Sequence, residues 1–276
     1  MRNNFRIRPL IGLVAFLFVF LCATFPSLKV HVDGTLSLVL EAAAWAQEAE
    51  PVGEDFDDQF DNEPDIVISD PLEPVNRFFF HFNDKLYFWA LKPVARAYGA
   101  VIPQDFRICI RNAFHNILFP VRFVNNMLQG KFKNAGIELS RFCINTTAGV
   151  AGLGDPAKDV FHLTIKDEDL GQTFGYWGIG NGIYFCWPVL GPSTARDTLG
   201  LFGDSYLSPL AVVMENDQEA GLALYGVQQV NNTSLVLGDY ESFKESSFDP
   251  YISLRDAYIQ HRRSKIKDSS QSDKIY

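Results

Sequence analysis

The feature that most constrains the fold is an uncharged stretch of 26 residues, Leu170–Ala195. A stretch of this length is long enough to cross a bilayer as a helix. Several glycines and two prolines, Pro188 and Pro192, interrupt it, so it cannot form one continuous helix. The pair Asn181-Gly182 favours a tight turn. We therefore expect a hairpin-like excursion with aromatic residues around its bend; a buried glycine-rich connection between helices remains an open alternative.

The glycines in this stretch do not form a nucleotide-binding loop. In the segment Gly178–Ile183, isoleucine stands where the third glycine of GxGxxG is required, and no strand precedes it. The chain also has no GxSxG, HExxH or SxxK motif and no paired histidines with metal-ligand spacing. The sequence therefore gives no sign of catalytic residues, a metal or a cofactor, although a spatially assembled triad is not tested by sequence.

The N-terminal residues 1–46 have the pattern of an export signal or hydrophobic segment. Three arginines precede the uncharged apolar run Leu10–Phe25. Cys22 is the candidate lipidation residue, but the residues before it match a lipobox poorly, whereas Ala44-Trp45-Ala46 fits the small-residue cleavage rule at an unusually late position. An uncleaved anchor is the alternative, and every option places the body outside the cytoplasm.

The charge is unevenly distributed along the chain. Residues 47–70 hold ten Asp and Glu and no Lys or Arg, which predicts an acidic disordered linker over 47–69. Residues 71–276 hold 21 acidic and 20 basic residues, so their net charge is −1. Without a basic excess, we expect no nucleic-acid partner.

A strong helix signal follows the linker. Asp70 is placed to cap the helix, Pro71 to occupy its first position and Glu73 to complete a capping box. One apolar stripe then recurs at helical spacing: Leu72, Val75, Phe79, Phe82, Leu86 and Trp89. Further aromatic residues widen the apolar surface, so this helix needs either two protein layers or one protein layer and lipid; a central core helix is the alternative.

The remainder of the body is predicted to be mainly α-helical and a single domain. Apolar periodicity, caps and glycine stops predict helices over 103–117, 120–128, 132–148, 196–202, 209–225, 226–237 and 251–265, a turn over 167–173, and a polar loop from Asp155. The three cysteines of the body, Cys109, Cys143 and Cys186, permit one disulfide, but buried free thiols are at least as consistent with their apolar neighbours.

Several ordered motifs together resemble one family. They are DPLEPVNR (70–77) with Phe82-Asn83, LQGK (128–131), RFCINTTAGVAGLGDPA (141–157), GQTFGYWGIGNGIYFCWPVLGPSTARDTLG (171–200) and DPYISLRDAY (249–258). In this order they are similar to the MlaA (VacJ) phospholipid-transport proteins of Gram-negative bacteria, and the resemblance covers nearly the whole body, 70–262, which leaves a disordered polar tail over 263–276.

The resemblance implies a ring of amphipathic helices in the inner leaflet, on the periplasmic face, of the cell outer membrane. A central amphipathic channel would take mislocalised phospholipids from the outer leaflet and pass them to a periplasmic lipid-carrier protein, and trimeric porins would be partners. The resemblance also implies a gating hairpin, with residues Tyr176, Gly178, Gly180, Asn181, Gly182 and Tyr184, beside a first-helix channel wall at Phe82 and Asn83. Family members carry an N-terminal lipid on cysteine, a pattern from which Cys22 departs. A structural adaptor that binds porins without moving lipid is the alternative function, and a lipid hydrolase is the third.

Overall fold

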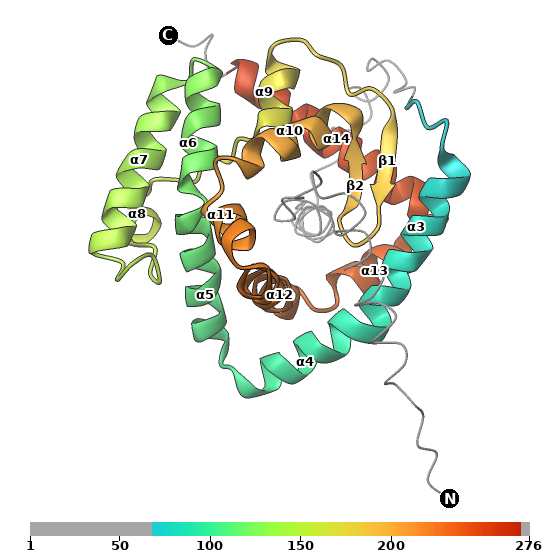
Figure 1. Cartoon of the computed structure of the whole chain (residues 1–276), viewed down its shortest axis with the longest axis horizontal. Helices are drawn as coiled ribbons and strands as arrows, with labels where there is room; N and C mark the ends of the chain where they lie inside the picture. Colours follow the sequence, from blue (N-terminus) through green and yellow to red (C-terminus); the bar gives the residue numbers. More distant parts are fainter. Residues whose placement is uncertain (1–67, 272–276) are drawn as a thin grey trace, which may run out of the picture.

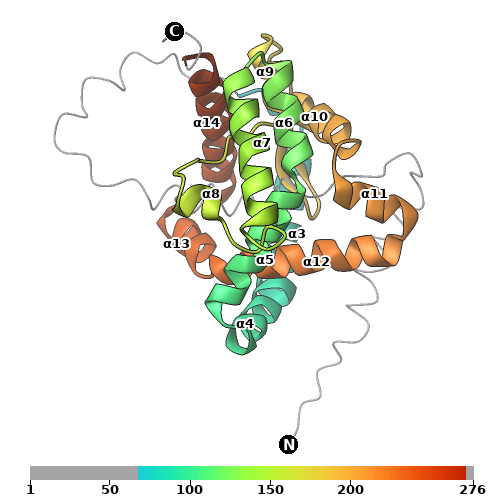
Figure 2. The same cartoon turned by 90° about the vertical axis from the view of Figure 1, so that its left-hand side faces the viewer.

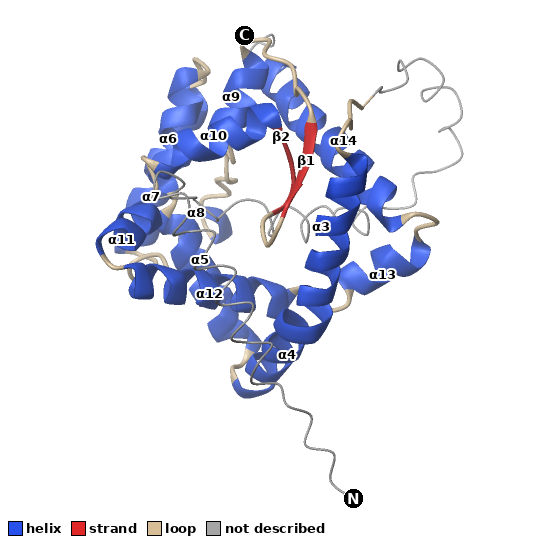
Figure 3. Cartoon of the chain, turned by 45° about the vertical axis from the view of Figure 1, so that its right-hand side comes forward, coloured by secondary structure: helices blue, strands red, loops and turns tan. Residues whose placement is uncertain are grey.

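The computed structural model describes residues 68–271, which form one mainly helical domain with a single small two-stranded sheet (Figure 3). The predicted export signal, Cys22 and almost all of the acidic linker lie outside the described residues. The helices are α3 (Glu73–Leu86), α4 (Lys92–Val101), α5 (Gln104–Ile117), α6 (Phe119–Leu128), α7 (Phe132–Thr147), α8 (Pro156–Asp159), α9 (Leu170–Tyr176), α10 (Ala195–Ser205), α11 (Pro209–Asn216), α12 (Gln218–Leu235), α13 (Asp239–Ser246) and α14 (Pro250–Gln271), with a π-helical turn η2 (Tyr87–Leu91) and the strands β1 (Tyr184–Trp187) and β2 (Gly191–Thr194).

The elements follow one another around a closed circuit (Figure 1). From α3 the chain passes through α4 and α5 to the antiparallel pair α6 and α7; α9 packs on α6 and on α14, and the β1–β2 hairpin connects α14 back to α3. Helix α12 lies on the inner side of α4 and α5, which it contacts. The view from the side shows α12 running across the direction of α6 and α7 (Figure 2).

The first helical segment begins later than its cap signal indicates. Helix α3 begins at Glu73, Leu72 occupies the cap position, and no side chain caps the helix. The expectation that Asp70 is the N-cap is wrong, because its carboxylate is occupied by residues of α3 and α14 instead. Downstream, the α-helical register widens into the π-turn η2 just before Pro93, whose ring nitrogen has no hydrogen to donate to the preceding turn.

Part of the domain buries polar side chains and exposes apolar ones. The faces that α6 and α7 bury are polar, and they include Arg122, Asn125, Glu138 and Arg141. Several large apolar side chains are exposed: Phe78, Trp89 and Phe106 are each 66% exposed and Phe132 is 67% exposed.

The predicted first helix is present, but the apolar stripe predicted along it is not a buried surface. Leu72, Val75 and Trp89 are exposed, whereas the buried residues of α3 are Asn76, Phe80 and Asp84. The helix therefore points its polar side toward the protein and much of its apolar side away from it, which is the reverse of a helix in a water-soluble core.

Small residues allow the close approach of α9 and α10. A Cβ on Gly200 of α10 would lie 2.7 Å from the Cα of Gly171 on α9, and a Cβ on Gly171 would lie 2.7 Å from Arg262 and from Asp197. Side chains at either position would separate the two helices. The glycines thus bring α9, α10 and α14 within reach of one buried ionic network.

Other helix predictions are mostly confirmed, with shifted ends. The predicted helices over 103–117, 120–128 and 132–148 agree with α5, α6 and α7 within two residues. The polar loop at Asp155 instead contains the short helix α8, capped by the Asp155 carboxylate, and the break between α11 and α12 falls at Asp217, whose side chain caps α12. Helix α14 continues to Gln271, so the prediction of a disordered tail from residue 263 is wrong for its first part.

Candidate functional site

The candidate site is built around the β1–β2 hairpin. Its strands pair antiparallel from Tyr184↔Thr194 to Trp187↔Gly191, and residues 188–190 form the turn. The expectation that Asn181-Gly182 forms the bend is wrong: both residues precede β1. The bend contains Val189 at φ 69°, a left-handed conformation that is rare for a β-branched residue and must be held by its surroundings.

Two asparagines of α3 hold this hairpin. Asn83 donates from Nδ2 to the Trp187 carbonyl at 2.8 Å and accepts at Oδ1 from the Val189 amide at 2.7 Å. Asn76 donates to the Tyr184 carbonyl at 3.1 Å and accepts from the Cys186 amide at 2.9 Å. A carboxamide presents the same donor and acceptor pair as a peptide group, so Asn76 bonds to the free edge of β1 as a residue of a third strand would, while Asn83 bonds to the end of β1 and the bend.

Asp70 connects Asn76 of α3 to helix α14. Its carboxylate accepts hydrogen bonds from Asn76 Nδ2 at 2.8 Å and from the Tyr251 hydroxyl at 2.5 Å, and Arg255 lies 3.4 Å away. The carbonyl of Ser69 accepts from the amide of Tyr184 at 3.1 Å. The residues that lead into α3 therefore fix both the hairpin and the final helix.

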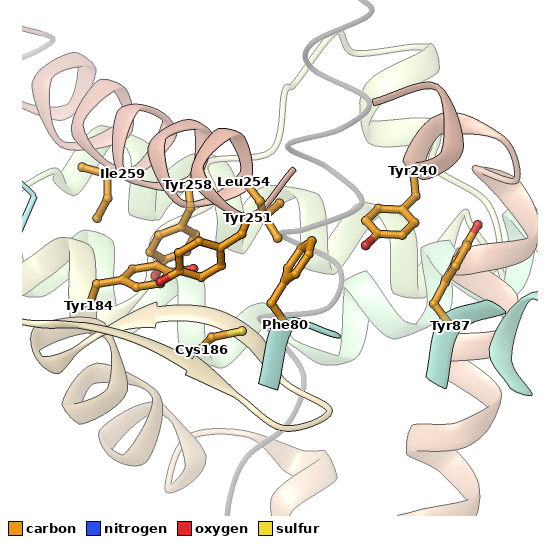
Figure 4. Close-up of a cluster of buried hydrophobic side chains, with 9 residues drawn as sticks. All are labelled: Phe80, Tyr87, Tyr184, Cys186, Tyr240, Tyr251, Leu254, Tyr258 and Ile259. Atoms are coloured by element: carbon orange, nitrogen blue, oxygen red, sulfur yellow. The ribbon is translucent and has the colours of Figure 1, made fainter. Parts of the chain in front are cut away.

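An aromatic cluster fills the space between the hairpin, α3, α13 and α14 (Figure 4). Its buried members are Phe80, Tyr87, Tyr184, Cys186, Tyr240, Tyr251, Leu254, Tyr258 and Ile259. Burial raises the pKa of the Cys186 thiol to about 12 and raises that of Tyr184 well above its usual value, so both side chains stay neutral. In the described part of the chain, Cys109, Cys143 and Cys186 are all free thiols.

The predicted gating residues divide between three elements. Tyr176 is the last residue of α9, Tyr184 is the first residue of β1, and the loop between them carries Gly178, Gly180, Asn181 and Gly182. A Cβ added at Gly178 (φ +88°) or at Gly180 would meet no neighbouring atom within 4 Å, so this loop segment is open. The structure therefore places Tyr184 in the hairpin that Asn83 holds but leaves the two glycines outside it.

The end of this loop is tied to the start of α10. The carbonyls of Asn181 and Ile183 accept from the amides of Arg196 and Ala195. A pocket of about 200 Å³ adjoins this point and is lined by Ile68, Ser69, Asn181, Gly182, Tyr184, Thr194, Ile259 and Arg263. Of the predicted first-helix pair, Asn83 bonds to the hairpin, and Phe82 is half-buried beside it.

A buried ionic network supports the hairpin from the other side. Arg262 of α14 is 2% exposed and donates to Asp169, the cap of α9, and to Asp197 of α10, which also accepts from the Tyr258 hydroxyl at 2.8 Å. Burial would raise the pKa of Asp197, but the charges of Arg262 and Arg196 outweigh it and hold the pKa below its usual value. These contacts fix the helices on which the hairpin rests.

A second carboxylate near this network has a different environment. Asp204 of α10 accepts from Asn125 Nδ2 at 2.8 Å and from the Leu170 amide at 2.9 Å. Burial and then the negative charge of Asp169 raise the pKa of Asp204 to about 7. By contrast, burial and the positive charge of Arg122 lower the pKa of His115 to about 4.

Among residues 68–271, no three His, Cys, Asp or Glu side chains are grouped so as to hold a metal ion. In the same part of the chain, no helix combines the length and the apolar character needed to cross a bilayer.

Sequence reasoning missed Asn76, Asp70 and Arg262 as organising residues. A signal for the first was present: Asn76 and Asn83 are seven residues apart, so they share one face of a helix that is otherwise rich in aromatic residues. Polar amides at that spacing on such a helix indicate bonded partners, because a buried amide without them is costly. No comparable pattern marks Arg262, whose partners are far apart in sequence.

Comparisons with known proteins agree with this architecture. A family model described as MlaA lipoprotein matches residues 68–265. The intermembrane phospholipid transport system lipoprotein MlaA of Haemophilus influenzae is 30% identical over 203 residues, 72% of this chain and 80% of that protein. The protein of the same name from Escherichia coli is 32% identical over 195 residues, 70% of this chain and 76% of that protein.

A solved structure supports the same relationship. A chain described under "Structural basis for maintenance of bacterial outer membrane lipid asymmetry" matches with a TM-score of 0.62 and 32% identity, over 72% of this chain and 99% of that chain. The family resemblance found in the sequence is confirmed, and the family is one of non-enzymatic transport lipoproteins. The chain belongs to the MlaA lipoprotein family.

Proposed function

We propose that this protein transfers phospholipid between membranes, removing mislocalised phospholipids from the outer leaflet of the outer membrane and delivering them to a periplasmic carrier. The proposal is supported by relatives that are named for intermembrane phospholipid transport and by a related structure described in terms of outer-membrane lipid asymmetry. In this proposal the circuit of helices is a ring that lies in the inner leaflet and encloses an amphipathic path for lipid.

The exposure of large aromatic side chains, in a domain that buries many polar ones, is the observation that carries the proposal. Four exposed aromatic residues on α3, η2, α5 and α7, namely Phe78, Trp89, Phe106 and Phe132, each keep about two thirds of their surface uncovered. Transfer of one such side chain from water into an apolar medium contributes roughly 1.5–3 kcal/mol when complete. Lipid acyl chains supply that medium, while the buried polar residues of α6 and α7 pair within the protein, as Arg122 does with Glu138 and Asn125 with Asp204, and hold the helices together without an apolar interface.

We further propose that the hairpin and the loop before it form a movable wall of the lipid path. The open loop at Gly178 and Gly180 has room to move, and Asn83 joins the hairpin bend to α3 through two hydrogen bonds. In this view Tyr176 and Tyr184 mark the ends of the mobile segment. Trimeric porins and a periplasmic lipid carrier are the proposed protein partners.

The deciding experiment is deletion of the gene followed by measurement of phospholipid in the outer leaflet. We expect outer-leaflet phospholipid to rise on deletion and to return to normal on complementation with the full chain. Unchanged lipid asymmetry would contradict the proposal and favour an adaptor that binds porins without moving lipid.

A second experiment tests the orientation in the leaflet. The double substitution Phe106→Glu and Phe132→Glu should weaken binding to phospholipid vesicles in a flotation assay, because each places a charge where acyl chains are proposed. Gln218→Glu, at an exposed position at the start of α12, adds a charge away from these faces and serves as the control. Equal binding of both variants would contradict immersion of these helices.

A further inference from the structure

Helix α12 carries a row of buried polar atoms that have no hydrogen-bond partner. Gln229 is 5% exposed, and neither its Nε2 nor its Oε1 is bonded; the Oγ1 of the fully buried Thr233 is also unbonded. Gln228, which is 4% exposed, has an unbonded Oε1, and Asn232 has an unbonded Oδ1. We call these four residues, Gln228, Gln229, Asn232 and Thr233, the amide row.

The amide row differs from other polar residues of the same helix. Asn231 accepts from the Tyr98 hydroxyl at 2.9 Å and donates to the Arg107 carbonyl at 2.9 Å. Ser234 is bonded to the Arg107 guanidinium through both its hydroxyl and its carbonyl. Polar side chains of α12 that face α4 and α5 are therefore satisfied, whereas those of the amide row are not.

Helix geometry places the amide row away from those neighbours. Successive residues of an α-helix are rotated by about 100°, so Gln229 and Thr233, each two residues from Asn231, lie about 200° from it. They occupy the side of α12 opposite α4 and α5, and Gln228 and Asn232 adjoin them on the flank. Helix α11 packs on the flank that carries Gln228 and Asn232, whereas Gln229 and Thr233 are directed away from α4 and α5, toward the inner side of the circuit (Figure 1). Both side chains are covered there, so a lipid must displace that cover to reach them.

The side chains of the amide row are uncharged and can both donate and accept hydrogen bonds. From Ala220 to Gly238 the sequence has no charged residue. Carboxamides both donate and accept, and a threonine hydroxyl does the same. A phospholipid offers matching groups, because its phosphate and ester oxygens accept hydrogen bonds and many head groups donate them.

We propose that the amide row is a hydrogen-bonding site for the phosphate and glycerol-ester region of a phospholipid that passes along α12. This inference rests on the proposed function and identifies the part of the lipid path that contacts the head group. Neutral partners give weaker hydrogen bonds than charged ones, so the row holds a lipid anion without trapping it. It also accepts different head groups, since the contacts are to the part that all phospholipids share.

The test compares Gln229→Leu with the wild-type full chain and with Gln218→Leu, which makes the same change at an exposed position of α12. Three quantities are measured: the melting temperature, the phospholipid bound per protein by native mass spectrometry, and the rate of transfer of fluorescent phosphatidylglycerol and phosphatidylethanolamine between vesicles. We expect Gln229→Leu to keep or raise the melting temperature, because an unbonded buried amide is replaced by an apolar side chain. We expect its transfer rate to fall at least fivefold for both lipids, with Gln218→Leu unchanged.

The outcomes separate this inference from the function on which it rests. If the wild-type protein transfers phospholipid and the transfer rate of Gln229→Leu is within twofold of the wild-type rate, the inference is overturned but the proposed function is not. Wild-type protein that neither binds nor transfers phospholipid overturns the proposed function and this inference with it. If Gln229→Leu melts at a markedly lower temperature, its transfer rate does not decide the matter, and Thr233→Val decides it instead: a fivefold loss is expected, and transfer within twofold of wild type overturns the inference.

Discussion

Replacement of Asn83 by leucine should free the hairpin bend from α3 without unfolding the domain. The substitution is close in volume and removes two hydrogen bonds, of 2.8 Å to the Trp187 carbonyl and 2.7 Å from the Val189 amide. Each such bond contributes about 1 kcal/mol net, so the bend should lose about 2 kcal/mol. At 1.36 kcal/mol per factor of ten, opening of the bend becomes about thirty times more favourable.

Hydrogen–deuterium exchange at residues 184–194 measures this opening directly. The amide of Val189 should exchange about thirty times faster in Asn83→Leu than in wild type. Asn83→Asp keeps an acceptor for that amide but loses the donor to Trp187, so its exchange should be intermediate. Asn216→Leu removes an exposed asparagine that bonds only to the Val212 carbonyl of its own helix, and it should leave the hairpin unchanged. Exchange at Val189 within threefold of wild type, in a folded Asn83→Leu protein, would refute the role assigned to this amide.

The remaining predictions concern the helices that support the hairpin. Because the pKa of Asp204 is raised to about 7, the folded state binds a proton that the unfolded chain releases near pH 4, and the resulting stability is lost as pH rises through 7. In denaturant titrations, the free energy of unfolding of Asp204→Asn should therefore rise by about 2–3 kcal/mol relative to that of wild type as the pH increases from 5 to 8. A difference between the two proteins that does not change with pH would contradict the raised pKa. Arg262→Met removes the arginine partner of Asp169 and one of the two arginine partners of Asp197, so it should cost about 3 kcal/mol, whereas Arg263→Met at the exposed neighbouring position should change stability by under about 0.5 kcal/mol; similar melting temperatures would argue against the network. Gly200→Ala should cost about 1–3 kcal/mol, since its Cβ would lie 2.7 Å from the backbone of α9, while Gly136→Ala, with nothing within 4 Å, should be neutral or stabilising; the reverse order would contradict the close packing.

Local signals in the sequence are sufficient to predict most of the helices. Thr194 has the chemistry and the position of a cap for the helix that follows it, and its hydroxyl does accept from the Asp197 amide. Glycine ends α6, with Gly130 at φ 76°, as the sequence predicts. Caps and stops involve residues within four positions of each other, so the sequence contains all the information that they need.

Local sequence does not predict whether the apolar face of a helix is buried in the protein or exposed. The periodicity of Leu72, Val75 and Trp89 predicts a stripe, but the choice between a protein neighbour and other apolar surroundings depends on the whole arrangement. These side chains are exposed because α3 turns Asn76 and Asp84 inward toward bonded partners on the hairpin, α13 and nearby residues. Polar residues rather than apolar ones determine which side of the helix is inside.

Long-range contacts also decide where the site differs from expectation. Asp70 has the chemistry of a cap, yet its carboxylate bonds to Tyr251, which is 181 residues away. The bend of the hairpin falls at 188–190 because Asn83 bonds to the Val189 amide there, although Asn181-Gly182 has the better turn sequence. Tertiary hydrogen bonds of this kind outweigh local preference; the spacing of Asn76 and Asn83 indicates that bonded partners exist, but not which residues they are.

The edge of β1 has a consequence for how this protein behaves in a crowded compartment. A strand with free amides and carbonyls is a template on which a strand of another molecule can add. Here that edge is covered by the Asn76 side chain and the Ser69 carbonyl, which come from one short segment of the same chain. Asn76 therefore occupies hydrogen-bonding groups of β1 that would otherwise be available to a strand of another molecule, so its loss should favour self-association as well as loosen the hairpin.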